Sequence, residues 1–386
     1  MATASGAHRA GRGGVGDRSG DTVVGRFGLV DAPRTLIDAL VESSDTDELT
    51  IISNCSGERI AAHCARSDGG AIRSIAMATR TGEETRPSDR ARVLVRGAYD
   101  LHVHVAPDVP PRRIDDVTLA RRFAEVGLAG FGLKSHYTST AERAQIVSSL
   151  VPEVEVVGAL TLNQAVGGMN ALAVEIAARE GARIVWVPTV DSPAETAGRT
   201  EPAPGDKVPQ WARLQHELRE LGLGVEPVHV TDPGGQLRPE TRDVLRAIAR
   251  HGLILATGHL ARDDTFAVVD GALEEGVANI VVTHPEFTCQ NFSIEDQVAL
   301  AERGCLLERC LTTPHSGKTT WEHVFDGVRA VGVERTLFSS DLGNPDYPAV
   351  EDGLALWADR LLGAGFDEGD VQEMIVGQSR RLAGPP

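Results

Sequence analysis

The chain has 386 residues, of which 38 are Lys or Arg and 55 are Asp or Glu, so its formal net charge is −17. So acidic a chain has no general attraction for nucleic acid or for an anionic membrane surface. Hydrophobic residues make up 41% of the sequence, which is enough for a packed core. No run of about 18 apolar residues is present, so no segment is expected to span a bilayer.

The cysteines and the N-terminus indicate the cellular compartment. The five cysteines are odd in number and include no C-x-x-C pair, so we expect no disulfide framework. The first residues lack the apolar core of a secretory signal peptide. Together these features predict a cytoplasmic protein.

The N-terminal part of the chain differs from the rest. Residues 1–20 are rich in Gly, Ser and Arg, which predicts a disordered tail. Residues 21–58 have the pattern of a strand, a helix with Leu36 and Leu40 at helical spacing, and a second strand. This stretch resembles the start of the alpha subunit of a 3-oxoacid CoA-transferase, without enough chain to build that active site. We therefore interpret residues 21–92 as a remnant βαβ-like segment followed by a linker over 59–92, appended to the functional part.

From Val93 onward, short β-rich runs alternate with helical segments. Eight such pairs can be counted before Arg381, beginning with VRGAYDLHVHV and RIDDVTLARRFAEVG and ending with RTLFSSD and VEDGLALWADRLL. The fourth pair is ARIVWVPT and PQWARLQHELREL, which predicts a ring helix over about residues 210–220. This number of repeats and their apolar strands predict an α/β fold, a (β/α)8 TIM barrel over residues 93–386. A doubly wound open sheet is the alternative, but no G-x-G-x-x-G follows a strand.

Two stretches interrupt the repeat. Residues 189–208, after the fourth strand, are too long for an ordinary loop and predict a lid or substrate loop. Residues 224–240, before the fifth strand, predict a β-hairpin with Gly234 and Gly235 at its turn.

Polar side chains close several of the predicted strands. Because the carboxyl ends of barrel strands meet at one mouth, these side chains are expected to converge there. They are, in chain order, His102 and His104 on the first strand, Lys134 and His136 on the second, His259 on the fifth, His284 on the sixth and Asp341 on the eighth.

Imidazole and carboxylate donors together suit a divalent transition metal, with zinc foremost and manganese or iron as alternatives. His102 and His104 are two residues apart, so both should face the same side of a strand. The alternative is that these histidines are hydrogen-bonded core residues and that Asp341 caps the turn-rich segment after it. Glu308 could be a ligand or a substrate contact, but we expect it to pair with Arg309 or another neighbour.

The motifs DLHVH, GH after the fifth strand, TH after the sixth and SSD after the eighth resemble those of the amidohydrolase superfamily of metal-dependent hydrolases. The resemblance covers roughly residues 94–384. It implies that His102 and His104 bind one metal, that His259 and His284 bind or shape a second site, and that Asp341 is both ligand and general base.

Two residues of the second strand have open roles. Lys134 is either a carboxylated bridge between two metals, as the resemblance implies, or a plain cation that holds a substrate carboxylate or an oxyanion. His136 is either a substrate contact or a further ligand. The number of metals, one or two per chain, stays open for the same reason.

The expected function is hydrolysis of a C–N bond in an amide or cyclic amide by metal-activated water. The substrate is a small molecule. Lys134 with Arg112 and Arg113 would suit an anionic one, whereas the preferred interpretation of the arginine pair is a solvated loop. A lactonase, a phosphoesterase or a non-oxidative decarboxylase is an alternative on the same site. A barrel that binds metal without catalysis is an alternative of another class, and a homo-oligomer is left open.

Overall fold

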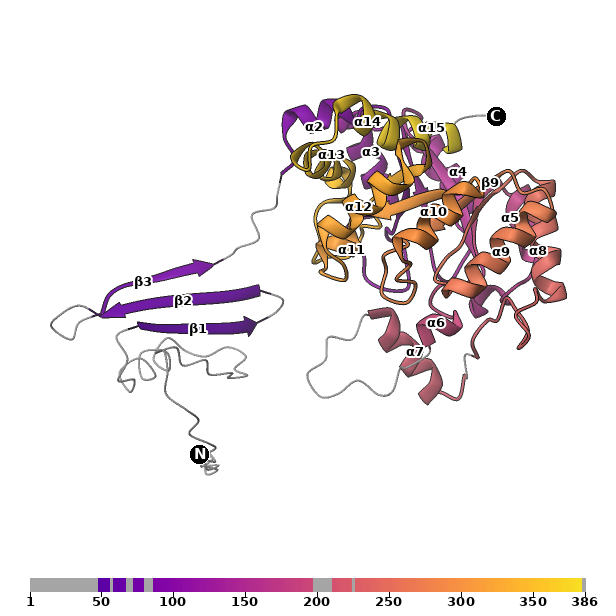
Figure 1. The fold of residues 1–386 in the computed structure, drawn as a ribbon, viewed down its shortest axis with the longest axis horizontal. Helices are drawn as coiled ribbons and strands as arrows, with labels where there is room; N and C mark the ends of the chain where they lie inside the picture. Colours follow the sequence, from indigo (N-terminus) through magenta and orange to yellow (C-terminus); the bar gives the residue numbers. More distant parts are fainter. Residues whose placement is uncertain are drawn as a thin grey trace. The chain divides into compact units, whose positions relative to one another are not determined.

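The computed structural model describes residues 48–55, 58–66, 72–79, 86–196, 210–223 and 226–383 (Figure 1). The chain divides into two units, Met1–Glu84 and Thr85–Pro386, which are described separately. The predicted tail over 1–20 and the helix predicted around Leu36 lie outside the described residues.

The described part of the first unit is a three-stranded sheet of β1 (Glu48–Cys55), β2 (Glu58–Arg66) and β3 (Ile72–Thr79). Both pairs are antiparallel. Two of these strands lie where the sequence predicts a linker. The scattered Arg, Ser and Glu residues obscured the strand pattern, because antiparallel strands tolerate polar residues in alternation.

The second unit contains eight parallel strands in chain order, as predicted for a barrel. They are β4 (Tyr99–Val103), β5 (Gly130–Leu133), β6 (Glu155–Thr161), β7 (Ala182–Trp186), β8 (Ile254–Ala256), β9 (Asn279–Thr283), β10 (Leu306–Cys310) and β11 (Thr336–Ser339). The first and last strands meet where Asp341 N donates to the carbonyl of His102 at 2.8 Å and His104 N donates to that of Leu342 at 2.8 Å. The sheet is therefore a near-closed barrel, and the predicted fold class is confirmed.

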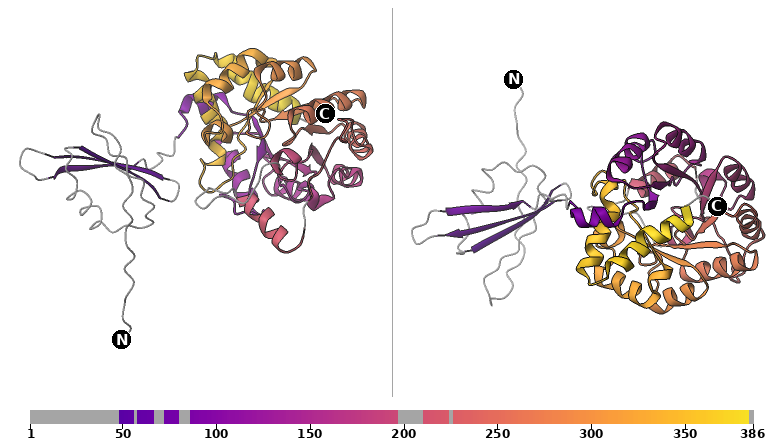
Figure 2. Two further views of the ribbon diagram at one scale, coloured as in Figure 1. Left: turned by 60° about the horizontal axis from the view of Figure 1, so that its bottom comes forward. Right: turned by 90° about the horizontal axis from the view of Figure 1, so that it is seen from above.

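Helices surround the strands as a ring (Figure 2). The ring contains α3 (Asp116–Val126), α4 (Ala141–Leu150), α5 (Ala171–Arg179), α8 (Pro239–Arg250), α9 (Arg262–Glu274), α10 (Ile294–Glu302), α12 (Trp321–Val331) and α13 (Gly353–Gly363). Local sequence fixes their ends. For example, the Asp115 side chain accepts from Thr118 N at 2.8 Å at the start of α3, and Gly127 ends it at a φ of 81°.

The other helices lie at the two ends of the barrel (Figure 1). Those at the amino ends of the strands are α2 (Asp89–Leu94), α14 (Glu368–Gln372) and α15 (Gln378–Ala383), joined by a π turn over Glu373–Gly377. Those at the carboxyl ends are α6 (Pro193–Thr196), α7 (Gln210–Glu220) and α11 (Thr312–His315). Short 3-10 turns cover Gln164–Val166, Val333–Arg335 and Val350–Asp352.

The fourth crossover differs from the prediction. Sequence analysis places the helix of residues 210–220 in the ring, but this helix, α7, belongs to the long insertion. The helix that packs against the sheet is α8, whose Val244, Leu245 and Ile248 are buried in the core. The predicted hairpin is reduced to a single bridge between Thr231 and Leu237 that leads into α8.

The barrel interior is filled by apolar side chains of the strands, among them Leu101, Ile184 and Trp186. The polar residues that close the strands therefore lie above this packed apolar interior. Among the helices of the described ranges, none has the length and apolar character needed to cross a bilayer.

Candidate metal centre

A β-bulge turns both histidines of β4 toward the barrel interior. Tyr99 and Leu101 pack inside the barrel, whereas Val103 packs in the outer core. The register slips by one residue between Asp100 and Val103, opposite Phe131–Leu133 on β5. This extra residue reverses the in-and-out alternation of side chains along β4. His102 and His104 consequently face the barrel interior.

Asp341 brings β11 to the two imidazoles. Its Oδ1 lies 3.2 Å from Nε2 of His102 and 3.3 Å from Nε2 of His104. Its Oδ2 accepts a hydrogen bond from Thr312 Oγ1 at 2.7 Å, and its backbone has a φ of 54°. One carboxylate oxygen is thus anchored, and the other is shared by two imidazole nitrogens.

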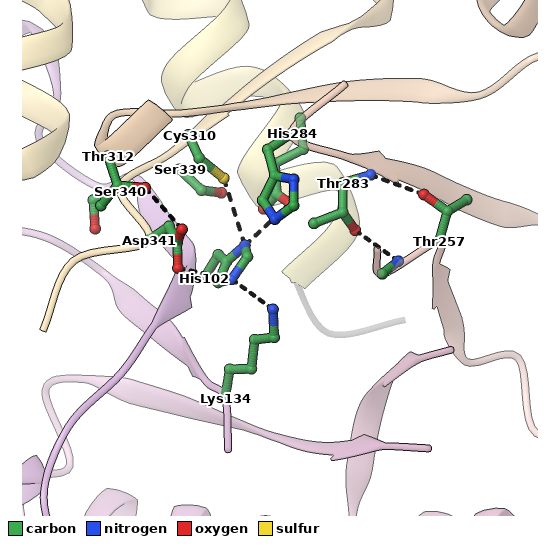
Figure 3. Close-up of polar contacts among 12 residues, drawn as sticks. His102, Lys134, Thr257, Thr283, His284, Cys310, Thr312, Ser339, Ser340 and Asp341 are labelled. Atoms are coloured by element: carbon green, nitrogen blue, oxygen red, sulfur yellow. Dashed lines mark hydrogen bonds and ion pairs between the residues drawn. The ribbon is translucent and has the colours of Figure 1, made fainter. Parts of the chain in front are cut away.

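Lys134 enters the same cluster from β5 (Figure 3). Its Nζ lies 2.9 Å from Nε2 of His102 and 5.0 Å from the ring centroid of Trp186. The side chain is 1% exposed, and burial lowers the pKa of its amine. Nζ of Lys134 therefore faces the imidazole nitrogen that a metal ion would need.

The remaining histidines complete a ring of imidazoles. Adjacent ring centroids are 4.8 Å apart for His104 and His136, 6.1 Å for His136 and His259, and 4.9 Å for His259 and His284. His284 returns to His102 at 6.0 Å. The residues predicted from five separate strands therefore meet at one place.

Gln290 fixes the tautomer of His284. Its amide nitrogen donates to the carbonyls of Gly258 and Thr283, so its Oε1 is the acceptor that faces His284 Nδ1 at 2.7 Å. Nδ1 of His284 therefore carries the proton, and its Nε2 keeps a free lone pair.

The protonation states suit metal binding except at His102, where burial lowers the pKa but the nearby carboxylates outweigh it and raise the pKa overall. Burial holds the pKa of His104, His136 and His284 well below the ordinary value, so these imidazoles are neutral. Burial raises the pKa of Asp341, but the imidazoles of His102 and His104 outweigh it and hold this pKa well below its usual range. Neutral imidazoles and an ionised carboxylate are the forms that bind a divalent cation.

The donor set fits a metal ion. The ligand atoms of His102, His104 and Asp341 all lie within 4.8 Å of one another. Two imidazole nitrogens and a carboxylate oxygen match the preferences of zinc, manganese and iron.

Glu308 pairs with His102 and not with Arg309, the first of the partners predicted for it. Its Oε2 lies 3.2 Å from Nδ1 of His102, whereas Arg309 bonds to Glu286 and Gln297. Adjacent residues of a strand point to opposite faces, so Glu308 and Arg309 cannot pair. The period of two, applied to β10, could have revealed this contact.

Other groups at the site carried no signal in the sequence. Asn163 donates to the carbonyl of His136, and Thr189 Oγ1 lies 2.9 Å from Nδ1 of His136. Glu195 Oε1 lies 2.8 Å from Nδ1 of His259. All three follow strands by loop paths that a strand pattern does not specify.

Asp100 ties the bulge to the loop that carries Asp341. It is fully buried, and its Oδ1 accepts from Ser340 N at 2.9 Å and from His102 N at 3.4 Å. Its Oδ2 is buried without a hydrogen-bond partner. Burial raises the pKa of this carboxyl to about 7, above that of an ordinary aspartate.

The raised pKa predicts a dependence of stability on pH. Between about pH 4 and pH 7 the unfolded chain releases the Asp100 proton while the folded chain keeps it, so the free energy of unfolding falls as pH rises and levels off above about 7. Asp100→Asn should remove this component. Urea unfolding of metal-stripped protein across this range should show the variant gaining on the wild type as pH rises, and parallel curves would contradict the assignment.

The comparisons with known proteins agree on the fold. An amidohydrolase from Pseudomonas aeruginosa is 10% identical, with a TM-score of 0.50 over 76% of this chain and 97% of that chain. The probable dipeptidase PvdM of the same organism is 12% identical, with a TM-score of 0.48 over 76% and 96%. At this identity the first likeness shows a shared fold, as the resemblance implies.

No curated protein matches the chain, and nothing in the comparisons supports the likeness of residues 21–58 to a CoA-transferase. One family model does match, over residues 97–308, which contain six of the seven predicted site residues. The chain belongs to the family that this model describes, the Family of unknown function DUF6282.

Proposed function

We propose that the chain is a metal-dependent hydrolase that cleaves a C–N bond in a small amide or cyclic amide. One observation carries the proposal: Oδ1 of Asp341 lies 3.2 and 3.3 Å from the facing nitrogens of His102 and His104. These three residues would hold a divalent cation, zinc foremost. Such an ion would act as a Lewis acid toward a carbonyl oxygen and would lower the pKa of a bound water to about 7.

Asp341 would act as the general base. Its carboxylate is ionised at neutral pH, and Thr312 restrains one of its oxygens at 2.7 Å. The other oxygen faces the interior of the cluster, where it can take a proton from the attacking water and pass it to the leaving nitrogen. A single restrained carboxylate can thus serve both proton transfers.

Lys134 and His136 would contact the substrate. Lys134 either stabilises the developing oxyanion as a cation or becomes carboxylated and bridges two metals. The cationic role is supported by its place beside His102 and over Trp186. His136 would present the ring edge that is not held by Thr189.

An anionic substrate group would meet Arg112. Its guanidinium lies 3.2 Å from Nδ1 of His104, and its side chain is 12% exposed. Asp108 pairs with the same guanidinium at 2.6 Å and partly neutralises its charge. Arg112 would therefore orient an anionic group by hydrogen bonds more than attract it by net charge. Arg113 points away, to the carbonyls of Pro345 and Tyr347.

The proposal is tested by metal content together with turnover. The full-length protein should contain zinc or another divalent metal, lose turnover of an amide when stripped by a chelator, and regain it with added metal. A screen should include cyclic amides, lactones and phosphoesters. Loaded protein that turns over none of them would leave only the metal-binding barrel, and equal turnover by stripped protein would refute a metal-dependent reaction.

A further inference from the structure

A second group of ligand-type side chains lies at the mouth of the barrel and uses none of the residues of the His102–His104–Asp341 set. It consists of Glu195 from α6, His259 after β8 and Cys289 after β9. Oε1 of Glu195 lies 2.8 Å from Nδ1 of His259 and 3.6 Å from Sγ of Cys289. The three donor atoms all lie within 4.8 Å of one another.

Ser192 holds two of these residues in place. Its hydroxyl donates to the carbonyl of His259 at 2.7 Å and accepts from the backbone of Glu195 at 3.1 Å. Ser192, Glu195 and His259 are 0%, 5% and 6% exposed. The carboxylate and the imidazole are therefore fixed relative to each other by a buried contact of the backbone.

We propose that Glu195, His259 and Cys289 bind a second divalent metal ion through a carboxylate oxygen, an imidazole nitrogen and a thiolate sulfur. Tetrahedral zinc with bond lengths of about 2.0–2.3 Å places its donor atoms roughly 3.3–3.8 Å apart. The Glu195–Cys289 separation of 3.6 Å lies within this range and the Glu195–His259 separation of 2.8 Å lies below it, so binding would need a small side-chain shift at that pair. The fourth position is open to water or to a substrate group.

The contact between His259 and Glu195 already brings an imidazole nitrogen and a carboxylate oxygen together. Nδ1 of His259 is buried and lies 2.8 Å from Oε1 of Glu195. A metal ion needs both lone pairs to converge and does not need the hydrogen-bond direction. A sulfur donor further distinguishes this site from the first, because thiolate favours zinc over manganese or magnesium.

Binding displaces one proton from the Cys289 thiol to solvent, since the thiolate is the ligand form. The process requires no oxidant or reductant. It is also independent of turnover, so the site can be present whether or not the proposed hydrolase activity exists. The two proposals can therefore fail separately.

Cobalt(II) titration of stripped full-length protein tests the site, because a cobalt–thiolate bond produces a charge-transfer absorption band. We expect the band in wild-type protein and its loss in Cys289→Ser, with one metal fewer per chain by elemental analysis. Cys305→Ala is the matched control, since Cys305 is buried and belongs to none of the ligand clusters in the described residues. It should keep the band.

Cys310 gives the outcome that overturns the proposal. Its Sγ lies 3.5 Å from Nδ1 of His102, in a cluster with Glu308. If the band survives in Cys289→Ser and disappears in Cys310→Ser, the thiolate ligand is Cys310 and the site proposed here is wrong.

A labelling experiment on wild-type protein tests the site even if Cys289→Ser does not fold. Iodoacetamide labelling of Cys289, followed by peptide mass spectrometry, should slow by at least about tenfold when zinc is bound. Glu195→Gln should reduce that protection while keeping the thiol. Equal labelling of Cys289 in zinc-loaded and stripped protein would overturn the proposal.

Discussion

Replacing Asp341 with asparagine is expected to lower kcat by about 10²- to 10⁴-fold on any amide that the wild-type protein hydrolyses. The side-chain amide of the introduced asparagine cannot accept a proton from the attacking water, although it keeps an oxygen near His102 and His104. Thr312 can still donate to that side chain, so the local structure should survive. Steady-state kinetics of the metal-loaded variant measure the effect.

Asp263→Asn is the matched control, because this carboxylate is 93% exposed and pairs with Arg262 at the surface. It should leave kcat unchanged. Metal content separates the two roles of Asp341: retained metal with lost turnover identifies the base, whereas lost metal identifies chiefly a ligand. Unchanged turnover in the Asp341 variant would exclude both roles and with them the proposed chemistry.

The sequence predicted most of the barrel because the fold repeats. Eight β-rich runs separated by helical segments specify the strand order, and a parallel barrel gathers all carboxyl ends at one mouth. His259 and His284, 25 residues apart, could therefore be expected near His102, and their rings indeed lie 4.9 Å apart, with His284 6.0 Å from His102. Topology carried this prediction without any knowledge of the loops.

Features set by irregular backbone escaped the sequence. The bulge in β4 decides which face His102 occupies, yet DLHVH has no glycine or proline to mark it. Glu195 reaches His259 from a four-residue helix inside a segment that lacks periodicity. In both cases tertiary hydrogen bonds, from Asp100 and from Ser192, determine the backbone path.

The fourth crossover shows a related difficulty. Residues 210–220 and α8 both have helical patterns, and only packing decides which of them covers the strands. Val244 and Leu245 of α8 are fully buried, whereas the apolar residues that follow α7, Leu221 and Leu223, are 73% and 59% exposed. A longer apolar stripe on α8 is visible in the sequence, but the long insertion before it hid the register of the repeat.

Gly343→Ala is expected to destabilise the barrel and to impair the metal site together. Gly343 follows the strand-end residue Asp341, has a φ of 140°, and lies against β4 so closely that an added Cβ would meet the carbonyl oxygen of His104 at 1.7 Å. Backbone cannot move aside as a flexible side chain does, and the positive φ adds strain for any L residue.

The expected loss in the free energy of unfolding is about 2–5 kcal/mol, from overpacking and backbone strain combined. Gly363→Ala is the matched control, because it ends α13 with nothing within 4 Å of an added Cβ, and it should change stability by less than about 1 kcal/mol. Chemical unfolding measures both variants, and zinc titration of the folded fraction should show weaker binding only in Gly343→Ala, since its collision displaces the backbone of His104. Equal stability and equal zinc affinity in the two variants would mean that β4 and β11 do not meet as closely as the site requires.

The backbone contacts that close the barrel, Asp341 N to the carbonyl of His102 and His104 N to that of Leu342, also position the three proposed metal ligands. A change that opens the barrel there should therefore also weaken metal binding.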